Sequence, residues 1–302
     1  VLKSYFIGII YAFITGALLG GALLLFGREF LSLFANEEAV IEAGLQRTGI
    51  MGLSYAVSAF MDCAIAAPTF RTENSNTKTH ANEFWMIEPE IAFADINDLM
   101  DIEEDFLKYI VKHVLEECPN EIDFFDKFVE KGLKEKLEKV VNSNFVRIDH
   151  KDVIDLLISS GEKFEFAPSY DDDIAKEHEK WLTKHFNGPV FVKNWPKDIK
   201  AYYMKLNEDG KTVAAVDLEV PGSGELMGGS QREEKLDILL ARMEELGIDK
   251  EPIDWYLNLR RYGGCIHSGF GMGFERLIMY LTGVENIRDV IAFPRTPNNC
   301  LY

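Results

Sequence analysis

The sequence predicts an α+β fold, an antiparallel sheet flanked by helices, over residues 68–302, preceded by two membrane-type helices. Three features of the 302-residue chain support this prediction. Segments that alternate with a period of two are joined through polar loops, as in β-hairpins. Amphipathic segments with helical spacing lie between them. The composition also changes near residue 67, where an apolar stretch gives way to a charged one. Hairpin-joined strands with intervening helices are typical of α+β proteins.

The chain as a whole is acidic, with 32 Lys and Arg against 50 Asp and Glu and a formal net charge of −18. This balance excludes a protein whose whole surface binds nucleic acid, because phosphate binding needs a basic footprint, but it leaves room for a local basic groove. The four cysteines are widely spaced and form no C-x-x-C pair. A disulfide framework and a cysteine zinc site are therefore both disfavoured, and a reducing compartment fits best.

Residues 4–27 carry no charge, and at 1.5 Å per residue such a helix covers roughly the ~30 Å of a bilayer core. An amphipathic link follows, and then a second apolar stretch over 48–67 that is interrupted by Asp62. We therefore expect a transmembrane-like helical unit over 1–67, which would associate with a membrane through 4–27. A buried helix of a large soluble core is the alternative. The "G-x-x-x-L-x-L-F" and "V-I-x-x-G-L" patterns after Gly27 also resemble part of the multidrug and toxin extrusion (MATE) transporters.

The charged part begins with PTFRTE and EFWMIEPEIAFAD on either side of the polar loop NSNTKTHAN, which predicts a long antiparallel hairpin. By alternation, one face of its second strand carries Phe84, Met86, Glu88 and Glu90. The opposite face, which we expect to point to the core, carries Trp85, Ile87 and Ile91. A helix should follow from about Asn97 to Cys118, capped by Asn97 or Asp98 and ended by Pro119. Its apolar stripe would be Leu99, Ile102, Phe106, Ile110 and Val114.

The remaining residues suggest alternating short elements. Residues 120–187 resemble several short helices with polar connections. Strands are expected at 189–194, 200–206 and 211–219, and the turn NEDG joins the last two. The stretch QREEKLDILLARMEELG is an amphipathic helix with Gly247 at its C-terminal cap. A strand near 263–269 and the helix GFERLIMYLTG close the chain.

A candidate phosphate site lies in GFGMGFERLIMY, where glycines at 269, 271 and 273 lead into a helix that carries Arg276. Free N–H groups and the dipole at a helix N-terminus attract phosphate, and an arginine adds a bidentate donor. The pattern is not a dinucleotide-binding fingerprint, because the third glycine of that motif would replace Phe274. A tight strand-to-helix junction without a ligand is the alternative.

A candidate magnesium site lies in AVDLEVPGSGELMGGSQRE, where Asp217 and Glu225 flank a Pro-Gly turn and could converge across it. Paired carboxylates beside phosphates are a common way of holding magnesium. Gly228 and Gly229 leave room for a ligand, and Arg232 could bind a carboxylate or an amide oxygen. A solvated hairpin with surface charges is the alternative.

Together, FRTENSNTKTHANEFWMIEPE and GFGMGFERL resemble motifs 2 and 3 of the class II aminoacyl-tRNA synthetases in their asparaginyl form. The resemblance runs from about Pro68 to Tyr302. It implies a ligase that uses ATP and Mg²⁺ to activate asparagine as asparaginyl-adenylate and transfers it to tRNA(Asn). It also implies a cytoplasmic location for this part, whereas residues 1–67 would favour a membrane. Members of this family are homodimers.

The resemblance also implies which residues bind ATP. Arg71 would neutralise the α-phosphate while asparagine's carboxylate attacks it, and Arg276 would share this catalytic role. Phe84 and Arg276 would sandwich the adenine, and Glu73 would accept from its amino group. The ATP site as a whole would consist of Arg71, Glu73, His80, Phe84, Glu225, Gly273 and Arg276, with His80 reaching the γ-phosphate.

For the metal and the amino acid, the resemblance implies a second set of residues. Asp217 and Glu225 would hold Mg²⁺. Glu88 would bind the substrate ammonium and Arg232 the side-chain carbonyl of asparagine. His267 and Ser268 would line the amino-acid pocket. For His80 and His267, an ordinary polar or hydrogen-bonded histidine is the alternative.

The sequence departs from the family pattern in two respects. Thr79 occupies a position where many relatives carry Arg, so phosphate contact by this loop is in doubt. We expect that neither an anticodon-binding domain nor motif 1, which carries the dimer interface in this family, precedes Pro68. We therefore expect a partial catalytic domain over 68–302 that is inactive or nearly so by itself, fused to an unrelated fragment. The alternatives are a membrane transporter fragment with a passenger domain and a tRNA-independent paralogue similar to an asparagine synthetase.

Overall fold

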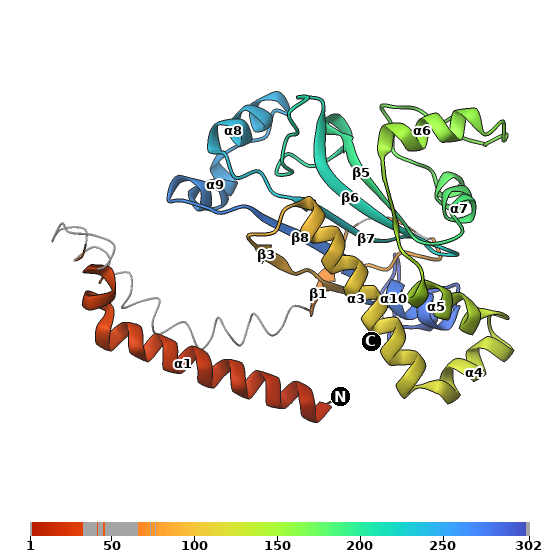
Figure 1. Ribbon diagram of the computed structural model, residues 1–302, viewed down its shortest axis with the longest axis horizontal. Helices are drawn as coiled ribbons and strands as arrows, with labels where there is room; N and C mark the ends of the chain where they lie inside the picture. The colour runs from red at the N-terminus through yellow and green to blue at the C-terminus, as the bar shows by residue number, and fades with distance from the viewer. Residues whose placement is uncertain are drawn as a thin grey trace. The chain divides into compact units, whose positions relative to one another are not determined.

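The structure, a computed structural model, describes residues 2–32, 41, 45, 66–72, 74–75 and 77–299 (Figure 1). The chain divides into two compact units, Val1–Ala67 and Pro68–Tyr302. In the first unit, helix α1 (Leu2–Ser32) is interrupted by a non-helical backbone at Phe26.

The expectation of membrane spans receives no support. No helix in the described part of the chain is long and apolar enough to cross a membrane. Most of the second expected helix, over 48–67, lies outside the described residues. Its last two positions already belong to strand β1 (Ala66–Phe70).

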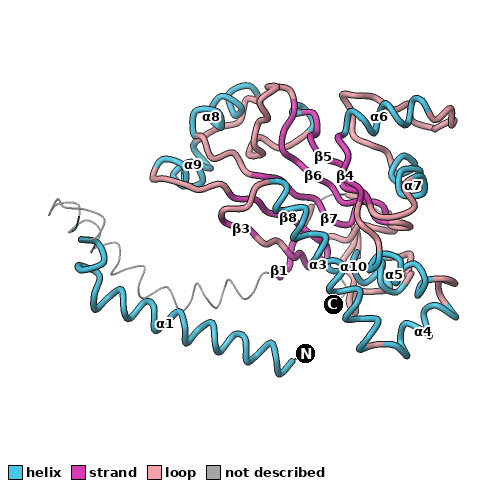
Figure 2. The backbone as a smooth tube through the Cα atoms, in the orientation of Figure 1, coloured by secondary structure: helices cyan, strands magenta, loops and turns pink. Residues whose placement is uncertain are grey.

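The second unit is built on a sheet that contains eight strands in the described residues, in the order β1-β2-β8-β7-β6-β5-β4, with β3 also pairing with β8 (Figure 2). After β1, the strands are β2 (Glu83–Ile87), β3 (Glu90–Ala92), β4 (Val146–Asp149), β5 (Val190–Pro196), β6 (Thr212–Val220), β7 (Gly224–Gln231) and β8 (His267–Gly273). The pairs from β2 through β8, β7 and β6 to β5 are antiparallel, and β4 pairs with β5 in parallel. The predicted antiparallel α+β sheet is thus confirmed.

Helices cover the sheet around two main apolar cores. The helices α3 (Ile96–Glu117), α4 (Pro119–Phe128), α5 (Leu133–Asn142) and α10 (Phe274–Thr282) share one core with Phe191, Leu218, Met227 and Phe270. On the other face, α6 (His150–Ser159) and α7 (Lys176–His185) pack on Val190, Val192, Val213 and Ala215. A smaller cluster joins α8 (Leu236–Glu245) to α9 (Asp254–Arg261). Figure 2 shows α3 crossing the sheet, with α8 and α9 at one end and α4 and α5 at the other.

Several elements differ from the sequence expectations. Residues 200–206 form turns with isolated bridges, Met204 to Arg232 and Leu206 to Val213, instead of a strand. Strand β4, which has only four residues, was not expected, and β7 was expected only in the alternative reading as a hairpin, because three glycines weaken its strand pattern. The cap of α3 is Asp95, whose carboxylate accepts from the backbone N–H groups of Asn97 and Asp98.

The buried stripe of α3 matches the expected one only in part: Leu99 is fully buried, and Phe106, Ile110 and Val114 pack, partly buried, against the core. Its fully covered residues are Leu99, Met100, Glu103, Leu107 and Val111, whereas Ile102 is 37% exposed. Glu103 lies inside this stripe. The stripe was predicted from apolar residues at helical spacing, so a buried glutamate hid which side of the helix faces the core.

Candidate functional site

The floor of the site is one face of β8. Phe270 and Met272 point into the α3 core, so the alternating residues His267, Gly269, Gly271 and Gly273 lie on the opposite face. The glycines matter because side chains of β2, of β3 and of the short connection between them lie close to these positions. A Cβ at Gly269 would lie 2.5 Å from the Glu90 carboxyl group, and one at Gly271 would lie 3.1 Å from Met86 Cε and 3.7 Å from Glu88 Oε1.

A cavity of about 180 Å³ opens at one end of this floor. Its lining brings together residues that are about two hundred positions apart in the sequence, namely Arg71, Thr79, His80, Phe84, Glu225, Gly273 and Arg276. The guanidinium carbon of Arg71 lies 5.2 Å from the centre of the Phe84 ring. Arg71 and Arg276 therefore face the same cavity, as the sequence analysis expected. Glu73, the remaining expected ATP contact, lies outside the described residues.

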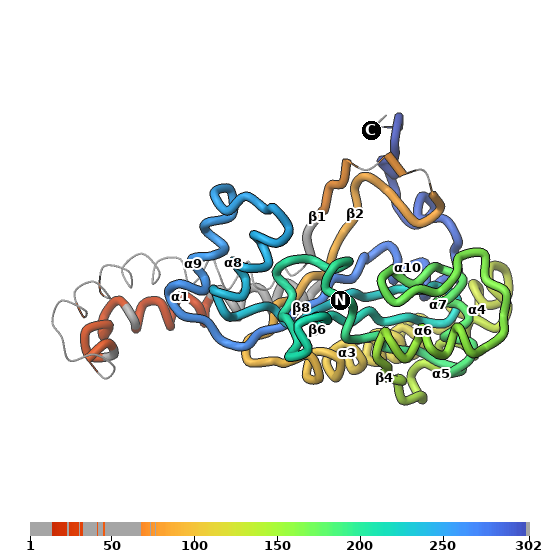
Figure 3. The backbone as a smooth tube through the Cα atoms, turned by 90° about the horizontal axis from the view of Figure 1, so that it is seen from above, coloured from red at the N-terminus to blue at the C-terminus, as the bar shows by residue number. Residues whose placement is uncertain are grey.

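The hairpin that carries Arg71 and Phe84 is fixed at both strands. The backbone N–H of Arg71 donates to the Asn82 carbonyl at 2.9 Å, and Asn82 Nδ2 donates back to the Arg71 carbonyl at 2.8 Å. On β2, both carboxylate oxygens of Glu275 accept from the Trp85 N–H at 3.0 Å. In Figure 3 the two strands rise from the sheet on the side away from α3. Trp85 is 46% exposed, contrary to its expected core position, because α3 packs on the central strands β6, β7 and β8.

The carboxylates of Asp217 and Glu225 converge beside Gly228. A Cβ at Gly228 would lie 2.9 Å from Glu225 Oε1 and 3.2 Å from Asp217 Oδ1, so both oxygens face one small space next to bare backbone. Asp217 Oδ2 accepts from Lys200 Nζ at 2.6 Å. No group of three or more His, Cys, Asp or Glu residues in the described part of the chain is arranged to hold a metal. Mg²⁺ is usually held by one or two carboxylates together with substrate phosphates, and the pair fits that use.

Burial controls the protonation of this acidic cluster. Desolvation raises the pKa of Asp217 to about 7, against the opposing effect of Lys200. It also raises the pKa of Glu179 to about 7, with a further contribution from the nearby Glu225. Burial raises the pKa of Glu219 well above its ordinary value. Such a concentration of poorly solvated carboxylates is stabilised by a cation.

Arg232 is held in a pair that the sequence analysis did not identify. Its Nη2 and Nε donate to Glu90 Oε1 at 2.6 and 3.0 Å, and its guanidinium lies 5.3 Å from the centre of the Tyr203 ring. Glu90 also covers Gly269 and lines a cavity of about 280 Å³ that includes His267. The signal for Glu90 was present, because it shares a strand face with Glu88, but sequence alone does not show that Arg232 lies opposite.

The structure places the two residues expected to line the amino-acid pocket on opposite faces of strand β8. His267 lies on the glycine face, and its Nδ1 is 2.9 Å from the Cys265 carbonyl oxygen. Ser268 is fully buried on the α3 side, where its hydroxyl donates to the Ala94 carbonyl at 2.8 Å. Ser268 therefore lies on the face of β8 opposite to His267, because adjacent residues of a strand point to opposite faces, and its expected lining role stays a prediction.

Comparison with known proteins identifies the class. The family model of class II tRNA synthetases (D, K and N) matches residues 55–297. The chain belongs to this family. It is 62% identical over 263 residues to an asparagine–tRNA ligase of Acholeplasma laidlawii, covering 86% of this chain and 57% of the relative. It is 54% identical over 257 residues to an asparagine–tRNA ligase of Clostridium beijerinckii, covering 85% and 55%.

Solved structures point the same way. Asparaginyl-tRNA synthetase from Pyrococcus horikoshii, complexed with asparaginyl-adenylate, has a TM-score of 0.71 and 38% identity over 80% of this chain and 56% of its own. The Entamoeba histolytica enzyme with asparaginyl-adenylate has a TM-score of 0.70 and 30% identity over 78% and 52%. The chain thus spans about half the length of the relatives it matches. The family match begins at residue 55, inside the stretch expected to resemble efflux transporters, and these relatives lend that expectation no support.

Proposed function

We propose that the second unit carries the adenylation site of an asparagine–tRNA ligase, which activates asparagine with ATP and transfers it to tRNA(Asn). The observation that carries this proposal is the single cavity shared by Arg71, Phe84, Glu225 and Arg276. The asparaginyl-adenylate in similar solved structures supports the same substrate pair.

Adenylation brings two anions together, because the carboxylate of asparagine attacks the α-phosphate and pyrophosphate leaves. A fixed bidentate cation between them lowers the barrier by stabilising the charge that develops. Arg71 takes this role, since its strand is anchored through Asn82 and its guanidinium lies at the cavity. Phe84 and Arg276 hold the adenine between them, and His80 lies on the loop side, where the terminal phosphates would extend. Hydrogen bonding of adenine by Glu73 stays a prediction.

Asp217 and Glu225 would hold Mg²⁺, which supplies charge neutralisation for the phosphates when bound. Lys200 keeps one oxygen of Asp217 engaged, so the other oxygen points toward Gly228 and Glu225. The bare backbone of Gly228 leaves the room that the cation needs.

Selection of the amino acid rests on Arg232 and Glu90, with Glu88 beside them for the ammonium group. A side-chain amide offers one acceptor and two donors. Arg232 can donate to its carbonyl oxygen while Glu90 accepts from its NH₂ group. Aspartate in the same place would put its carboxylate against Glu90, and like charges at short range are strongly disfavoured. The pair therefore favours asparagine.

Binding of non-hydrolysable aminoacyl-adenylate analogues to the 302-residue chain, measured by calorimetry, tests this function. We expect the asparaginyl analogue to bind about 100-fold or more tightly than the aspartyl analogue. Glu90→Gln should narrow this preference, whereas Glu285→Gln, which affects an exposed carboxylate paired with Lys78, should not. Failure to bind either analogue, or a preference for the aspartyl one, would refute the proposal.

A further inference from the structure

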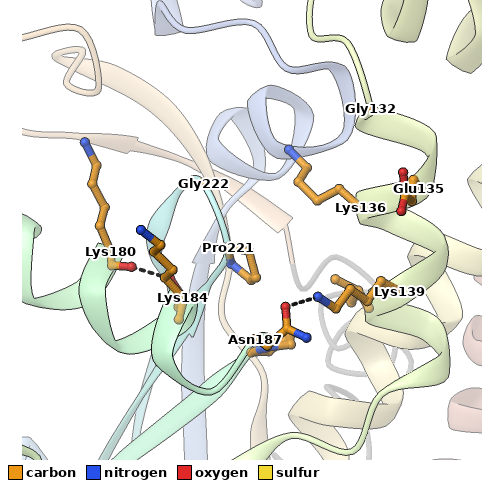
Figure 4. A pocket seen from close by; sticks show the side chains of 13 residues that line it. Gly132, Glu135, Lys136, Lys139, Lys180, Lys184, Asn187, Pro221 and Gly222 are labelled. Carbon is orange, nitrogen blue, oxygen red and sulfur yellow. Dashed lines mark hydrogen bonds between the residues drawn. The ribbon is translucent and has the colours of Figure 1, made fainter.

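A second cavity, of about 440 Å³, lies outside the adenylation site, and four of its thirteen lining residues are lysines. Lys180 and Lys184 of α7 face Lys136 and Lys139 of α5 across it, with Asn187 and the turn between β6 and β7 between them (Figure 4). Glu135 also lines it. Four lysines against one carboxylate stand out in a chain whose net charge is −18.

The lysines differ in how they are held. Lys136 is paired with Glu130 at 2.8 Å and lies 5.0 Å from the centre of the Tyr280 ring, and Lys139 donates to Asn187 Oδ1. Lys180 and Lys184 are exposed and form no ion pair with any described residue. The turn comes close as well, because a Cβ at Gly222 would lie 3.8 Å from Lys136 Nζ. The cavity thus has two anchored cations and two that remain available for a ligand.

The same helix connects this cavity to the adenylation site. Lys176, Lys180 and Lys184 recur every four residues along α7, so they lie on one helix face and span about 12 Å at 1.5 Å per residue. Lys176 Nζ lies 3.5 Å from the hydroxyl of Thr79. Thr79 lines the cavity of about 180 Å³ that also contains Arg71 and Arg276, which we call the nucleotide cavity. We call Lys139, Lys176, Lys180 and Lys184 the lysine track. It begins at the nucleotide cavity and ends in the lysine-lined cavity.

We infer that the lysine track binds the phosphodiester backbone of the acceptor arm of a tRNA, along the strand that leads its 3′ end into the adenylation site. This inference rests on the proposed function, in which the 3′ end must reach the adenylate. An RNA strand carries a phosphate at every nucleotide and therefore needs cations at intervals along a path. The track provides such a path, because its lysines are spread over two helices.

A small polyphosphate is the less suitable occupant. Compact anions are typically bound by convergent backbone N–H groups or by bidentate arginines. The track has separated, flexible ammonium groups, which act as point charges. The rest of the acidic surface repels RNA, so a local basic path would determine where RNA binds and would make binding depend on salt.

The test compares two triple variants of the 302-residue chain. One is Lys139→Gln, Lys180→Gln and Lys184→Gln. Its control is Lys112→Gln, Lys211→Gln and Lys250→Gln, which removes the same charge at exposed positions away from the cavity. The probe is a fluorescent hairpin with the sequence of the tRNA(Asn) acceptor arm, titrated at several salt concentrations. We expect the track variant to bind the hairpin about 10-fold or more weakly. The slope of log affinity against log salt concentration should be smaller in magnitude by about 2, because fewer lysines contact phosphates. Both quantities should change far less in the control.

Binding of the asparaginyl-adenylate analogue should be unchanged in both variants, which shows that the fold is intact. Equal RNA affinity and salt slope in the two variants, with analogue binding retained, overturns the inference and leaves the proposed function standing. The inference is also overturned if the track variant binds inorganic triphosphate more weakly than the control but binds RNA equally well. That result would indicate a small-anion site. If RNA binding depends on the track but the analogue does not bind, the proposed function fails and the RNA surface stands.

Discussion

Arg71 illustrates how much depends on the position of a single cation. Its backbone is hydrogen-bonded to Asn82 in both directions, and its guanidinium lies over Phe84 and lines the cavity that is proposed to bind ATP. A planar guanidinium can bridge a carboxylate and a phosphate at once, whereas an ammonium group cannot do so in the same geometry. The function of this residue is therefore a matter of shape as well as charge.

We predict that Arg71→Lys lowers the rate of asparagine-dependent ATP–pyrophosphate exchange by about 100-fold or more, because one preorganised donor is lost. The measurement uses a full-length enzyme in which residues 68–302 are joined to the N-terminal part of the 62% identical relative. Arg261→Lys, at an ion pair with Asp254, serves as the matched control and should have little effect. A rate for Arg71→Lys within about 3-fold of the parent would contradict the assigned role.

Glu103 presents the opposite situation, because it is an ionisable group in the core that has no hydrogen-bond partner in the described part of the chain. Its side chain is fully buried on α3, and neither carboxyl oxygen is bonded to any described residue. Burial, with a smaller contribution from the charge on Asp217, raises its pKa well above the ordinary value of 4.5. The folded state therefore binds a proton that the unfolded state releases above about pH 4.5, and stability falls as the pH rises through this window.

We predict that Glu103→Gln increases the free energy of unfolding at pH 8 by about 1 kcal/mol or more, because an amide has no charge to desolvate. The gain should shrink toward zero near pH 4, where the carboxyl group is protonated in both states. Urea unfolding at the two pH values measures the effect. Glu104→Gln is the neighbouring control and should destabilise instead, since Glu104 pairs with Lys108 and Arg147.

At the scale of elements, α3 determines how the sheet is covered, and its start is set by a capping box. The Asp95 carboxylate accepts from the backbone N–H of Asn97 at 2.7 Å and of Asp98 at 3.0 Å, and Asp98 accepts in return from the Asp95 N–H. These bonds satisfy N–H groups that the first turn of a helix leaves without partners. The helix thus begins directly after β3 and the short loop that follows it.

We predict that Asp95→Ala lowers the free energy of unfolding by about 1 kcal/mol, the usual cost of losing an N-terminal cap. Asn97→Ala, which replaces a residue that the sequence analysis regarded as a candidate cap, should change it by less than about 0.5 kcal/mol. Both changes in the free energy of unfolding are measured by urea unfolding, in variants whose free energy depends on urea concentration with the same slope. Equal losses in the two variants would show that the capping box is not what stabilises the first turn.

At the scale of the whole molecule, three elements bring their carboxylates to one end of the sheet. Asp217 and Glu219 come from β6, Glu225 from β7 and Glu179 from α7. A Cβ at Gly224 would lie 2.0 Å from Glu179 Oε2, which shows how closely α7 approaches the turn. The fold thus concentrates negative charge where magnesium is proposed to bind.

This concentration predicts a dependence on both pH and Mg²⁺. Because the pKa of Asp217 is raised from 3.8 to about 7, stability without Mg²⁺ should fall as the pH rises through this range. The Mg²⁺ concentration needed to promote ATP binding should rise about 10-fold from about pH 8 to about pH 6, as the carboxylates become protonated. Calorimetric titrations at the two pH values measure this. Asp217→Asn should abolish the Mg²⁺ effect and Asp237→Asn should preserve it, and a requirement independent of pH would contradict the site.

The sequence alone determined most local structure. Helix α10, strands β5, β6 and β8 and the cap at Gly247 (φ of 65°) lie within a few residues of their predicted positions. Helix α8 ends as predicted but begins at Leu236 instead of Gln231, which ends strand β7. These features depend on periodicity and turn chemistry, which act between residues close in the chain. The resemblance of motifs 2 and 3 likewise pointed to the family that the comparison shows.

The tertiary structure determined which residues that are distant in the sequence contact one another. Glu90 and Arg232 are 142 residues apart and meet because β3 and β7 both pair with β8. Glu103 faces the core because packing overrides its polarity, and Ser268 turns away from the site because strand register assigns it to the other face. The lysines of α5 and α7 form one cavity only after both helices pack at the same end of the sheet. Register and packing depend on the whole chain at once, so local sequence patterns do not contain them.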